Sequence, residues 1–492
     1  MTTSILNAEV SSLTTERAET PATITTPAYS IKHTIPSRFV FLILCVAIVL
    51  TALAFGTVHY WALAVFSLGS AALVILWVID AWKLGRIRIS RNPLQLPLLG
   101  MLALGLIQLL PLRNIGTAGV LSVSPVRTLS LDPYSTRFAL VQIAALLIYF
   151  AAILVFTDTP HRLRLLVRTV IIFGFFLAIF GLTQSFTSPT KVYWFRELTQ
   201  STAFGPFINR HHFAGYMELA LALPLGLLFG GSVKPEMRFI YLFAGGLMGT
   251  ALIMTGSRGG IISLGAEILF LVVVAGSRRK RKETEEQEKP QRIRRAATRA
   301  ALALVLIVGL FMGVVWFGGE SALNRFVGTV NSDDPTTGRA HFWSVTLDII
   351  KAHPILGTGL GAFGVVYTRY DSRNGLFRLE QAHNDYLQIL SDGGLAGAAL
   401  GLIFVVLLFR MGFARRESRD DFRSGVALGA LAGCFAALVH SFFDFTLHTT
   451  SNALLFLVLA ALATMNGRVE QAQSRRRRKR RTSGARPATI RH

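Results

Sequence analysis

The chain alternates long apolar blocks with shorter polar connectors. Most blocks approach the roughly 20 apolar residues needed to cross the ~30 Å hydrocarbon layer of a membrane. Their approximate limits are 38–58, 61–82, 94–112, 138–156, 165–187, 211–230, 239–256, 260–276, 300–318, 394–409, 425–443 and 452–466. Because no water reaches the backbone there, each segment must satisfy its own hydrogen bonds, which predicts helices. The pattern therefore predicts an all-α integral membrane protein with about 12 transmembrane helices.

The longest connector, residues 319–393, is predicted to be partly helical. "TTGRAHFWSVTLDIIKAHP" combines a threonine cap signal, a helical pattern and a proline stop. "ILGTGLGAFG" should turn or re-enter, and "FRLEQAHNDYLQILSDGG" reads as a helix with a glycine C-cap that leads into the tenth block. The predicted divisions are 1–37, a polar tail; 38–318, helices one to nine; 319–393, the large loop; 394–466, helices ten to twelve; and 467–492, a polybasic tail.

Charge fixes the predicted orientation. With the N-terminus inside, 37 of the 50 Lys and Arg residues fall on the inner side and 13 on the outer side. The positive-inside rule then puts both termini in the cytoplasm and the large loop outside. The first apolar block is too long for a signal peptide and should act as an uncleaved anchor. The basic runs in 278–295 and 475–481 are read as topology signals that attract lipid headgroups, rather than as nucleic-acid sites.

Composition supports a membrane protein and excludes several chemistries. Hydrophobic residues make up 52% of the 492, and charged residues only 16%, below the roughly 25% of soluble domains. The two cysteines, Cys45 and Cys434, lie in apolar blocks and form neither a disulfide framework nor a metal cluster. Walker A, G-x-S-x-G and H-E-x-x-H motifs are absent. ATP-driven transport, serine hydrolysis and zinc catalysis are therefore unsupported, and no cofactor is expected.

His383 is the first candidate for chemistry. A histidine titrates near neutrality and suits the removal of a proton from a hydroxyl. On a continuous helix, Glu380 would share its face and orient or tune it. A purely structural histidine is the alternative. The adjacent Asn384 is read as a residue that positions the substrate.

Three arginines are candidates for anion binding. Arg258 lies in "MTGSRGG" at a predicted membrane boundary, Arg339 opens the first loop helix, and Arg210 lies in "INRHHFAGY". Guanidinium forks match phosphate oxygens. The alternatives are a snorkelling anchor for Arg258 and a solvated charge for Arg339. His211 and His212 lack the helical spacing of metal ligands, and no metal site is predicted.

Each of the other polar residues has two possible roles. His440 and Asp444 are four residues apart, and either pair with each other or line the site. Glu218 and Glu267 lie inside predicted helices, where a carboxylate is functional or bonds to a neighbouring helix. Asp333 and Asp334 either bind a cation or form a turn.

At "GSRGG", "GRAHFW", "HPILGTGLGAFG" and "AHNDYLQILSDGGLAG" the sequence resembles the O-antigen ligase family. That superfamily also contains O-antigen polymerases and bacterial O-linked oligosaccharyltransferases. The resemblance covers roughly residues 40–465, and its strongest part is the pattern of His383, Asn384, Gly394 and Gly397. Ala382 stands where some ligases carry a second histidine, which leaves the subtype open.

The resemblance implies a C-type membrane glycosyltransferase of the bacterial inner membrane, with its site at the periplasmic face. The implied donor is a glycan on undecaprenyl pyrophosphate, and no metal or nucleotide sugar is needed. By correspondence of motifs, Arg258 and Arg339 would hold the pyrophosphate and His383 would be catalytic. Direct displacement would invert the anomeric centre.

Three acceptors compete within this reading: lipid A–core, another lipid-linked glycan, or a protein hydroxyl. The motifs favour a ligase or polymerase. The main alternative from another class is a polytopic transporter, although no two-fold repeat is visible. A peptidoglycan-type polymerase is a third reading, which rests on fold analogy alone.

Overall fold

The computed structural model describes residues 33–112, 127–198, 202–276, 339–372, 379–418 and 420–465, with five single positions between 297 and 312. By its internal contacts the chain divides into residues 1–34 and 35–492, and every element below belongs to the second unit. The α-helices are α1 Ile35–Leu53, α2 Tyr60–Leu84, α3 Gln95–Gln108, α4 Pro133–Phe156, α5 Pro160–Thr187, α6 Arg210–Phe229, α7 Arg238–Met254, α8 Arg258–Gly276, α10 Arg339–Ala352, α11 Phe363–Tyr370, α12 Asp385–Arg416, α13 Asp421–His440 and α14 Thr450–Thr464. The shorter elements are η1 Phe55–Thr57, η2 Pro235–Met237, η3 Thr446–His448, and the hairpin of β1 Lys191–Val192 and β2 Arg196–Glu197.

Within these ranges, nine helical segments are long and apolar enough to cross a membrane. They are α1, α2, α4, α5, α6, η2 with α7, α8, α12 and α13. The predicted blocks 94–112 and 452–466 correspond to the shorter apolar helices α3 and α14. The predicted block 300–318 lies almost wholly outside the described residues. The all-α, multi-pass membrane class is confirmed, whereas the number twelve stays a prediction.

Two helices begin at an Asp-Pro or Thr-Pro step. At the start of α4, the Asp132 carboxylate accepts hydrogen bonds from the backbone N–H groups of Tyr134 and Ser135. At the start of α5, Thr159 Oγ1 accepts one from Arg162 N. The following prolines have no N–H to satisfy and a φ already set for a helix. These caps start both helices five residues before the apolar blocks predicted from hydropathy.

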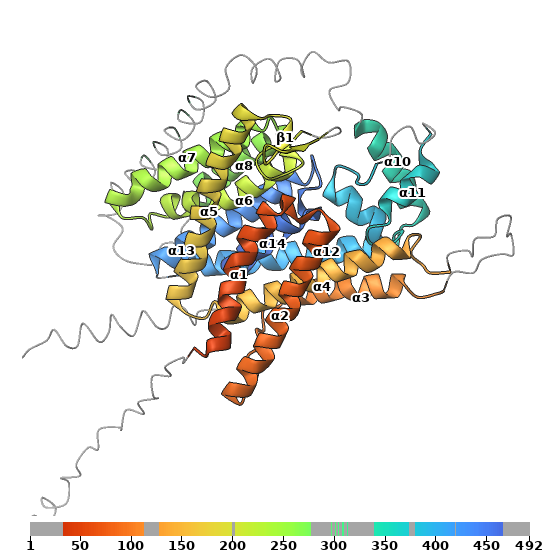
Figure 1. Ribbon diagram of the computed structural model, residues 1–492, viewed down its shortest axis with the longest axis horizontal. Helices are drawn as coiled ribbons and strands as arrows, with labels where there is room; N and C mark the ends of the chain where they lie inside the picture. Colours follow the sequence, from red (N-terminus) through yellow and green to blue (C-terminus); the bar gives the residue numbers. More distant parts are fainter. Residues whose placement is uncertain are drawn as a thin grey trace, which may run out of the picture. The chain divides into compact units, whose positions relative to one another are not determined.

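Among the described helices, α6 and α13 make the most extensive contact with each other. Every residue in the membrane-spanning window of α6 is buried by other parts of the protein. Glycines bring the two backbones together, since a Cβ at Gly226 would lie only 2.1 Å from Gly429 Cα. Small residues at such crossings permit the close van der Waals packing that holds membrane helices together. In Figure 1, α1 and α2 lie at an edge of the bundle, next to α4.

The large loop has a small core of its own. Helix α10 begins at Arg339 and ends just before Pro354, as the stop signal predicts. The predicted threonine cap lies outside the described residues. It packs with α11 and the start of α12 (Figure 1). The buried apolar residues of this cluster are Val345, Ile349, Ala362, Phe363, Val366, Tyr367, Leu379 and Ala382. Residues 319–338, which include Asp333 and Asp334, lie outside the described part of the chain.

Gly394 interrupts α12 and lets another segment cross it. Its φ of 61° and ψ of −160° are not helical, and this region of backbone space is open only to glycine. A Cβ there would lie 2.4 Å from Ile355 C. Beyond the crossing, Thr358 N donates to Ser391 O at 2.9 Å. The predicted glycine cap is therefore a break at which the 355–359 segment passes over α12.

The side chain of Gln108, at the end of α3, hydrogen-bonds to both segments of this crossing. Its Nε2 donates to Leu356 O at 2.6 Å and to Asp392 O at 2.8 Å. Its Oε1 accepts from Leu360 N at 2.9 Å. One buried amide side chain thus ties α3, the loop and α12 together, and all of its hydrogen-bonding atoms are used.

One element of the sequence prediction is wrong. The helix predicted to contain His383 begins only at Asp385, with Asn384 as its N-cap. His383 itself has a left-handed backbone, with φ of 52°. Asn384 Oδ1 accepts from the N–H groups of Tyr386 and Leu387, and this capping competes successfully with continuation of the helix toward Glu380.

Candidate active site

Three of the candidate arginines are each the first residue of a helix: Arg210 of α6, Arg258 of α8 and Arg339 of α10. Asn209 Oδ1 caps α6 by accepting from His211 N at 2.8 Å. Ser257 Oγ accepts from Gly260 N at 3.2 Å at the start of α8. Each guanidinium therefore stands at the positive end of a helix, an arrangement that favours an anion.

The starts of α6 and α8 meet. His211 Nδ1 lies 2.9 Å from Ser257 Oγ, which joins the first turns of α6 and α8. A Cβ built on Gly256 would lie 3.6 Å from Arg210 Nη1. The structure therefore brings Arg210 beside the "GSRGG" segment that carries Arg258.

Asp444, between α13 and α14, stands at the centre of the cluster. Its Oδ1 lies 3.3 Å from His383 Nδ1 and accepts a 2.9 Å hydrogen bond from Phe445 N. Its Oδ2 lies 3.5 Å from Arg339 Nη2 and 3.6 Å from His211 Nδ1. The side chain is 1% exposed. One buried carboxylate thus faces two histidines and an arginine that come from three other segments.

The pKa shifts of Asp444 and Arg339 reflect the short distances between the charged groups of the site. Burial raises the pKa of Asp444, but the hydrogen bond from His383 and the charges of His211, His383 and Arg339 outweigh it and hold that pKa well below its ordinary range. Burial lowers the pKa of Arg339; Asp444 opposes this effect, and the charge of Arg258 adds to it. The charge of Arg258 therefore acts on Arg339, and the Asp444 carboxylate stays ionised beside Arg339.

His383 is wedged between two aromatic rings. Its ring centroid lies 4.8 Å from that of Phe445, edge to face, and 6.3 Å from that of Phe342 in a stacked arrangement. Trp343 Nε1 donates to the preceding carbonyl, Ala382 O, at 3.1 Å. The His383 side chain is 26% exposed. Because Nδ1 faces Asp444, Nε2 is the nitrogen that can accept a proton from outside.

The residues after His383 are tied to the segment that carries Asp444. Asn384 Nδ2 donates to Phe442 O at 3.1 Å, and Asp385 N donates to Ser441 O at 2.9 Å. Ser441 Oγ donates back to Asp385 Oδ2 at 2.8 Å, and His448 Nδ1 lies 2.8 Å from Asp385 Oδ1. These bonds fix the distance between His383 and Asp444. They also stabilise the left-handed backbone at His383, which costs energy in a non-glycine residue.

His440 lies in a different setting. Its Nδ1 is 2.9 Å from Glu218 Oε2, both side chains are fully buried, and Ser263 Oγ also donates to Glu218. Gly259 leaves room for the imidazole, since a Cβ there would lie 2.7 Å from His440 Cδ2. The two readings of His440 and Asp444 are now separable: His440 pairs with Glu218 within the bundle, and Asp444 with the site.

The other predicted site residues are placed as follows. Asn384 is 7% exposed and its described hydrogen bonds are to the protein itself. Glu380 does not share a helix face with His383; its Oε2 lies over Gly364 of α11, 2.8 Å from where a Cβ would stand. The carboxylate beside His383 is Asp444. In the described part of the chain, no group of three or more His, Cys, Asp or Glu side chains is arranged to hold a metal ion.

Two members of the cluster were not predicted. His211 was considered only as a metal ligand, and Asp385 had no role assigned. His211 follows Arg210 at the same helix start, which is the sequence signal that would have found it.

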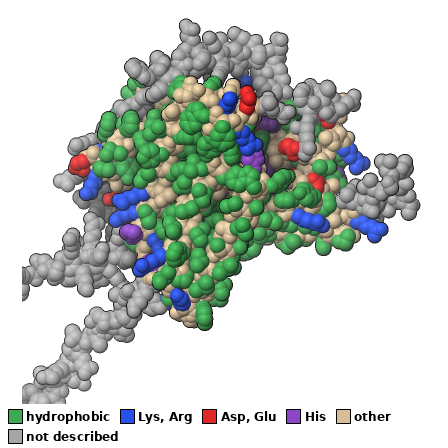
Figure 2. Space-filling view, in the orientation of Figure 1, with side chains coloured by type: hydrophobic (Ala, Val, Ile, Leu, Met, Phe, Trp, Pro, Cys, Tyr) green, Lys and Arg blue, Asp and Glu red, His purple; other side chains and the backbone are tan. Residues whose placement is uncertain are grey.

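Figure 2 shows Arg or Lys, His and acidic side chains gathered at a hollow on an otherwise largely apolar face.

Fold and site together define a multi-pass membrane protein with a histidine–aspartate pair inside a cluster of arginines. Residues 243–402 match the family model described as O-antigen ligase. An O-antigen ligase of Pseudomonas aeruginosa is 25% identical over 277 residues, which cover 55% of this chain and 57% of that protein. The match thus spans little more than half of the relative's length. Residues 243–402 thus carry the match to the O-antigen ligase family, and the resemblance seen in the motifs is confirmed.

The family match includes Arg258, Arg339 and His383. Arg210, His211 and Asp444 lie outside residues 243–402, and only the folded structure connects them to the others.

Proposed function

We propose that this protein is a membrane glycosyltransferase that moves a glycan from undecaprenyl pyrophosphate to an acceptor hydroxyl. The observation that carries the proposal is the pairing of His383 with Asp444 among Arg210, Arg258 and Arg339. By the predicted orientation, the transfer occurs at the periplasmic face of the inner membrane.

The arginines bind the pyrophosphate and stabilise it as the leaving group. Negative charge gathers on the pyrophosphate as its bond to the anomeric carbon breaks. Arg258 and Arg339, whose charges already repel, gain most from an anion held between them. Fixed positive groups near a low-dielectric boundary stabilise such charge as it develops. We expect Arg210 to contact the same anion, and we expect no metal ion to be needed.

His383 activates the nucleophile, which is the acceptor hydroxyl, by accepting its proton. The acceptor oxygen attacks the anomeric carbon, and its proton passes to His383 Nε2. Asp444 holds the proton of Nδ1 and stabilises the imidazolium that forms. The new C–O bond replaces the bond to pyrophosphate, undecaprenyl pyrophosphate departs, and the anomeric centre is inverted.

The acceptor separates the subtypes. Lipid A–core would define a ligase, a second lipid-linked glycan a polymerase, and a protein hydroxyl an oligosaccharyltransferase. The name of the P. aeruginosa relative favours the ligase.

The test is a reconstituted reaction. The purified protein would be incubated in liposomes with a glycan on undecaprenyl pyrophosphate and each acceptor in turn, with and without EDTA. We expect one covalent product, with the same yield in EDTA. Movement of the lipid-linked glycan across the bilayer with no covalent product would favour a transporter instead. Loss of activity in EDTA that magnesium restores would contradict the metal-free mechanism.

A further inference from the structure

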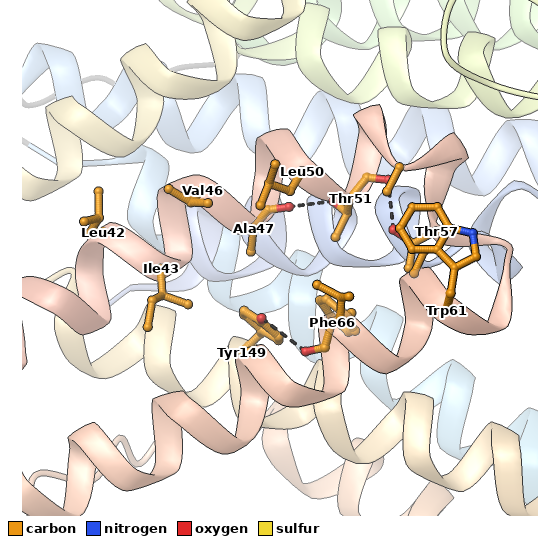
Figure 3. A pocket seen from close by; sticks show the side chains of 14 residues that line it. Leu42, Ile43, Val46, Ala47, Leu50, Thr51, Thr57, Trp61, Phe66 and Tyr149 are labelled. Carbon is orange, nitrogen blue, oxygen red and sulfur yellow. Dashed lines mark hydrogen bonds between the residues drawn. The ribbon is translucent and has the colours of Figure 1, made fainter. Parts of the chain in front are cut away.

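A second feature lies away from the candidate active site. A cavity of about 350 Å³ opens between α1 and α2, with Tyr149 of α4 at its base (Figure 3). Small, mostly buried positions such as Ala47, Ala62 and Gly69 form its floor. The rim consists of exposed large side chains from both helices: Leu42, Val46, Leu50, Trp61 and Val65. The shape is a groove on the bilayer-facing surface of two predicted membrane helices.

The hydroxyl groups in the groove are already hydrogen-bonded. Thr51 Oγ1 donates to Ala47 O at 2.7 Å, and Thr57 Oγ1 donates to Thr51 O at 2.9 Å. Tyr149 Oη donates to Phe66 O at 3.3 Å. The lining therefore presents methyl, methylene and aromatic groups. Such a cavity offers water few partners and suits a hydrocarbon chain.

A cation stands at one end of this groove. Arg196 Cζ lies 5.0 Å from the ring centroid of Phe55, and its Nη1 is 2.8 Å from His59 Nε2. Phe55 in turn meets Trp61 of the groove edge to face, with centroids 6.4 Å apart. Burial, and then the charge of Arg196, lower the pKa of His59, so its neutral ring can accept from the guanidinium. None of the described carboxylates lies within ion-pair distance of Arg196.

Exposed aromatic side chains surround the same end. Tyr60 is 70% exposed, Trp61 54%, Trp194 45% and Phe195 75%. Tyrosine and tryptophan gather where hydrocarbon meets lipid headgroups. We therefore expect Arg196 to lie at the depth of lipid phosphates, where Phe55 connects it to Trp61 of the apolar groove.

We infer that this groove binds one acyl chain of an anionic glycerophospholipid whose phosphate lies on Arg196. The charge at each site distinguishes this lipid from the proposed donor. A phosphodiester carries a single charge, which one guanidinium fork matches. The pyrophosphate of the proposed donor carries more charge and is matched by the three arginines of the candidate active site, Arg210, Arg258 and Arg339.

The cationic end of the groove contacts the segment that leads into α14, so a lipid bound there affects that segment. At its cationic end, Thr57 O accepts a 3.1 Å hydrogen bond from Thr450 Oγ1, and Gly56 packs on Thr449 and Phe207. These contacts connect the α1–α2 turn to the segment that leads into α14. The lipid therefore stabilises the end of the bundle that also holds Asp444.

Native mass spectrometry of the full-length protein tests the inference, with phosphatidylglycerol, phosphatidylethanolamine and undecaprenyl phosphate as probes. We expect one phosphatidylglycerol to be retained in preference to the other two. Arg196→Gln should weaken its binding by about tenfold, the effect of losing a charged hydrogen bond. Arg137→Gln, at an exposed position at the start of α4, should not change it. Ala62→Trp, which fills the groove, should abolish retention.

A photoactivatable acyl chain on phosphatidylglycerol avoids dependence on variants that fold poorly. In the unaltered protein it should label peptides of α1 and α2 within residues 42–66. Equal retention of the three lipids, unchanged binding in Arg196→Gln, or labelling confined to other helices would each overturn the inference. Preferential retention of undecaprenyl phosphate would overturn it too, because the groove would then belong to a polyprenyl chain.

Discussion

Two histidine–carboxylate pairs lie in this protein in opposite settings. His383 and Asp444 meet at the start of α12, with the imidazole 26% exposed and an arginine close to the carboxylate. His440 and Glu218 meet inside the helix bundle, both fully buried, with Ser263 as a further partner. We propose that the first pair serves the reaction and the second stabilises the fold, because only the first is accessible from outside and lies beside an arginine.

The difference is also one of connection. Glu218 and His440 link α6 to α13, the two helices that pack most closely. His383 and Asp444 both lie outside helices, in segments held by tethers on either side. The pair that we propose to meet the substrate therefore lies on loops fixed by a rigid scaffold, which is the usual arrangement for functional residues.

The largest effect on transfer should come from His383→Ala. It removes the proposed general base, which contributes roughly 10²–10⁴-fold to a rate. Transfer of radiolabelled glycan by purified variant would measure it, with monodispersity in detergent as the check on folding. A well-folded His383→Ala protein with unchanged rate would remove His383 from the mechanism.

Asp444→Asn should lower the rate roughly 10²-fold, because an amide holds the imidazole but does not stabilise its charged form. The loss should appear in kcat, with little change in KM for the acceptor. Asp444→Glu should recover part of it. A change in KM alone would instead assign Asp444 to acceptor binding.

Arg258→Lys and Arg339→Lys should each lower kcat/KM for the donor by about tenfold, since a point charge does not replace a fork. Arg137→Lys is the matched control at an exposed site. Full activity in both site variants would show that the pyrophosphate binds elsewhere.

His448→Gln should change activity little but alter how stability depends on pH. Burial lowers the pKa of His448, but the hydrogen bond and charge of Asp385 outweigh this and raise that pKa above its ordinary value. A raised pKa means that the contribution is complete below about pH 6.5, the value for an unfolded chain, and is lost as pH rises through the folded value. The melting-temperature difference from the unaltered protein should therefore shrink on going from pH 6 toward pH 9. The absence of any such trend would contradict the Asp385–His448 tether.

The smallest effect on the rate per folded molecule should come from the buried pair. Breaking it by His440→Ala leaves Glu218 with Ser263 but without the imidazole, and removing one member of a buried charged pair costs about 3–5 kcal/mol of stability. Replacing both, as Glu218→Leu with His440→Leu, should restore much of the folded yield. Normal folding but abolished transfer in the double variant would mean that this pair takes part in the chemistry.

The sequence predicted the helices well because hydrocarbon imposes one rule on every membrane-spanning segment. It also named His383, Arg258, Arg339 and Asp444. It failed at the helix start: "HND" supplies an N-cap and an acidic first turn, yet the apolar pattern suggested that the helix continued through His383.

The arrangement of the site was beyond sequence reasoning for a different reason. Asp444 and His383 are 61 residues apart, and nothing in either motif indicates that they meet. Their contact depends on how α12, α13 and α10 pack, which is decided by side-chain shape rather than by hydropathy.

The crossing at Gly394 has a practical consequence for building hybrid enzymes. Segment 355–359 passes over α12 at this break, and the side chain of Gln108 in α3 hydrogen-bonds to both. Exchanging only the connector 319–393 with that of a homologue would place a foreign segment across a native break and misalign the backbone acceptors of the Gln108 amide. The smallest transplantable module therefore includes the end of α3 and the first turns of α12 after Gly394. Specificity swaps designed on that boundary should fold where loop swaps fail.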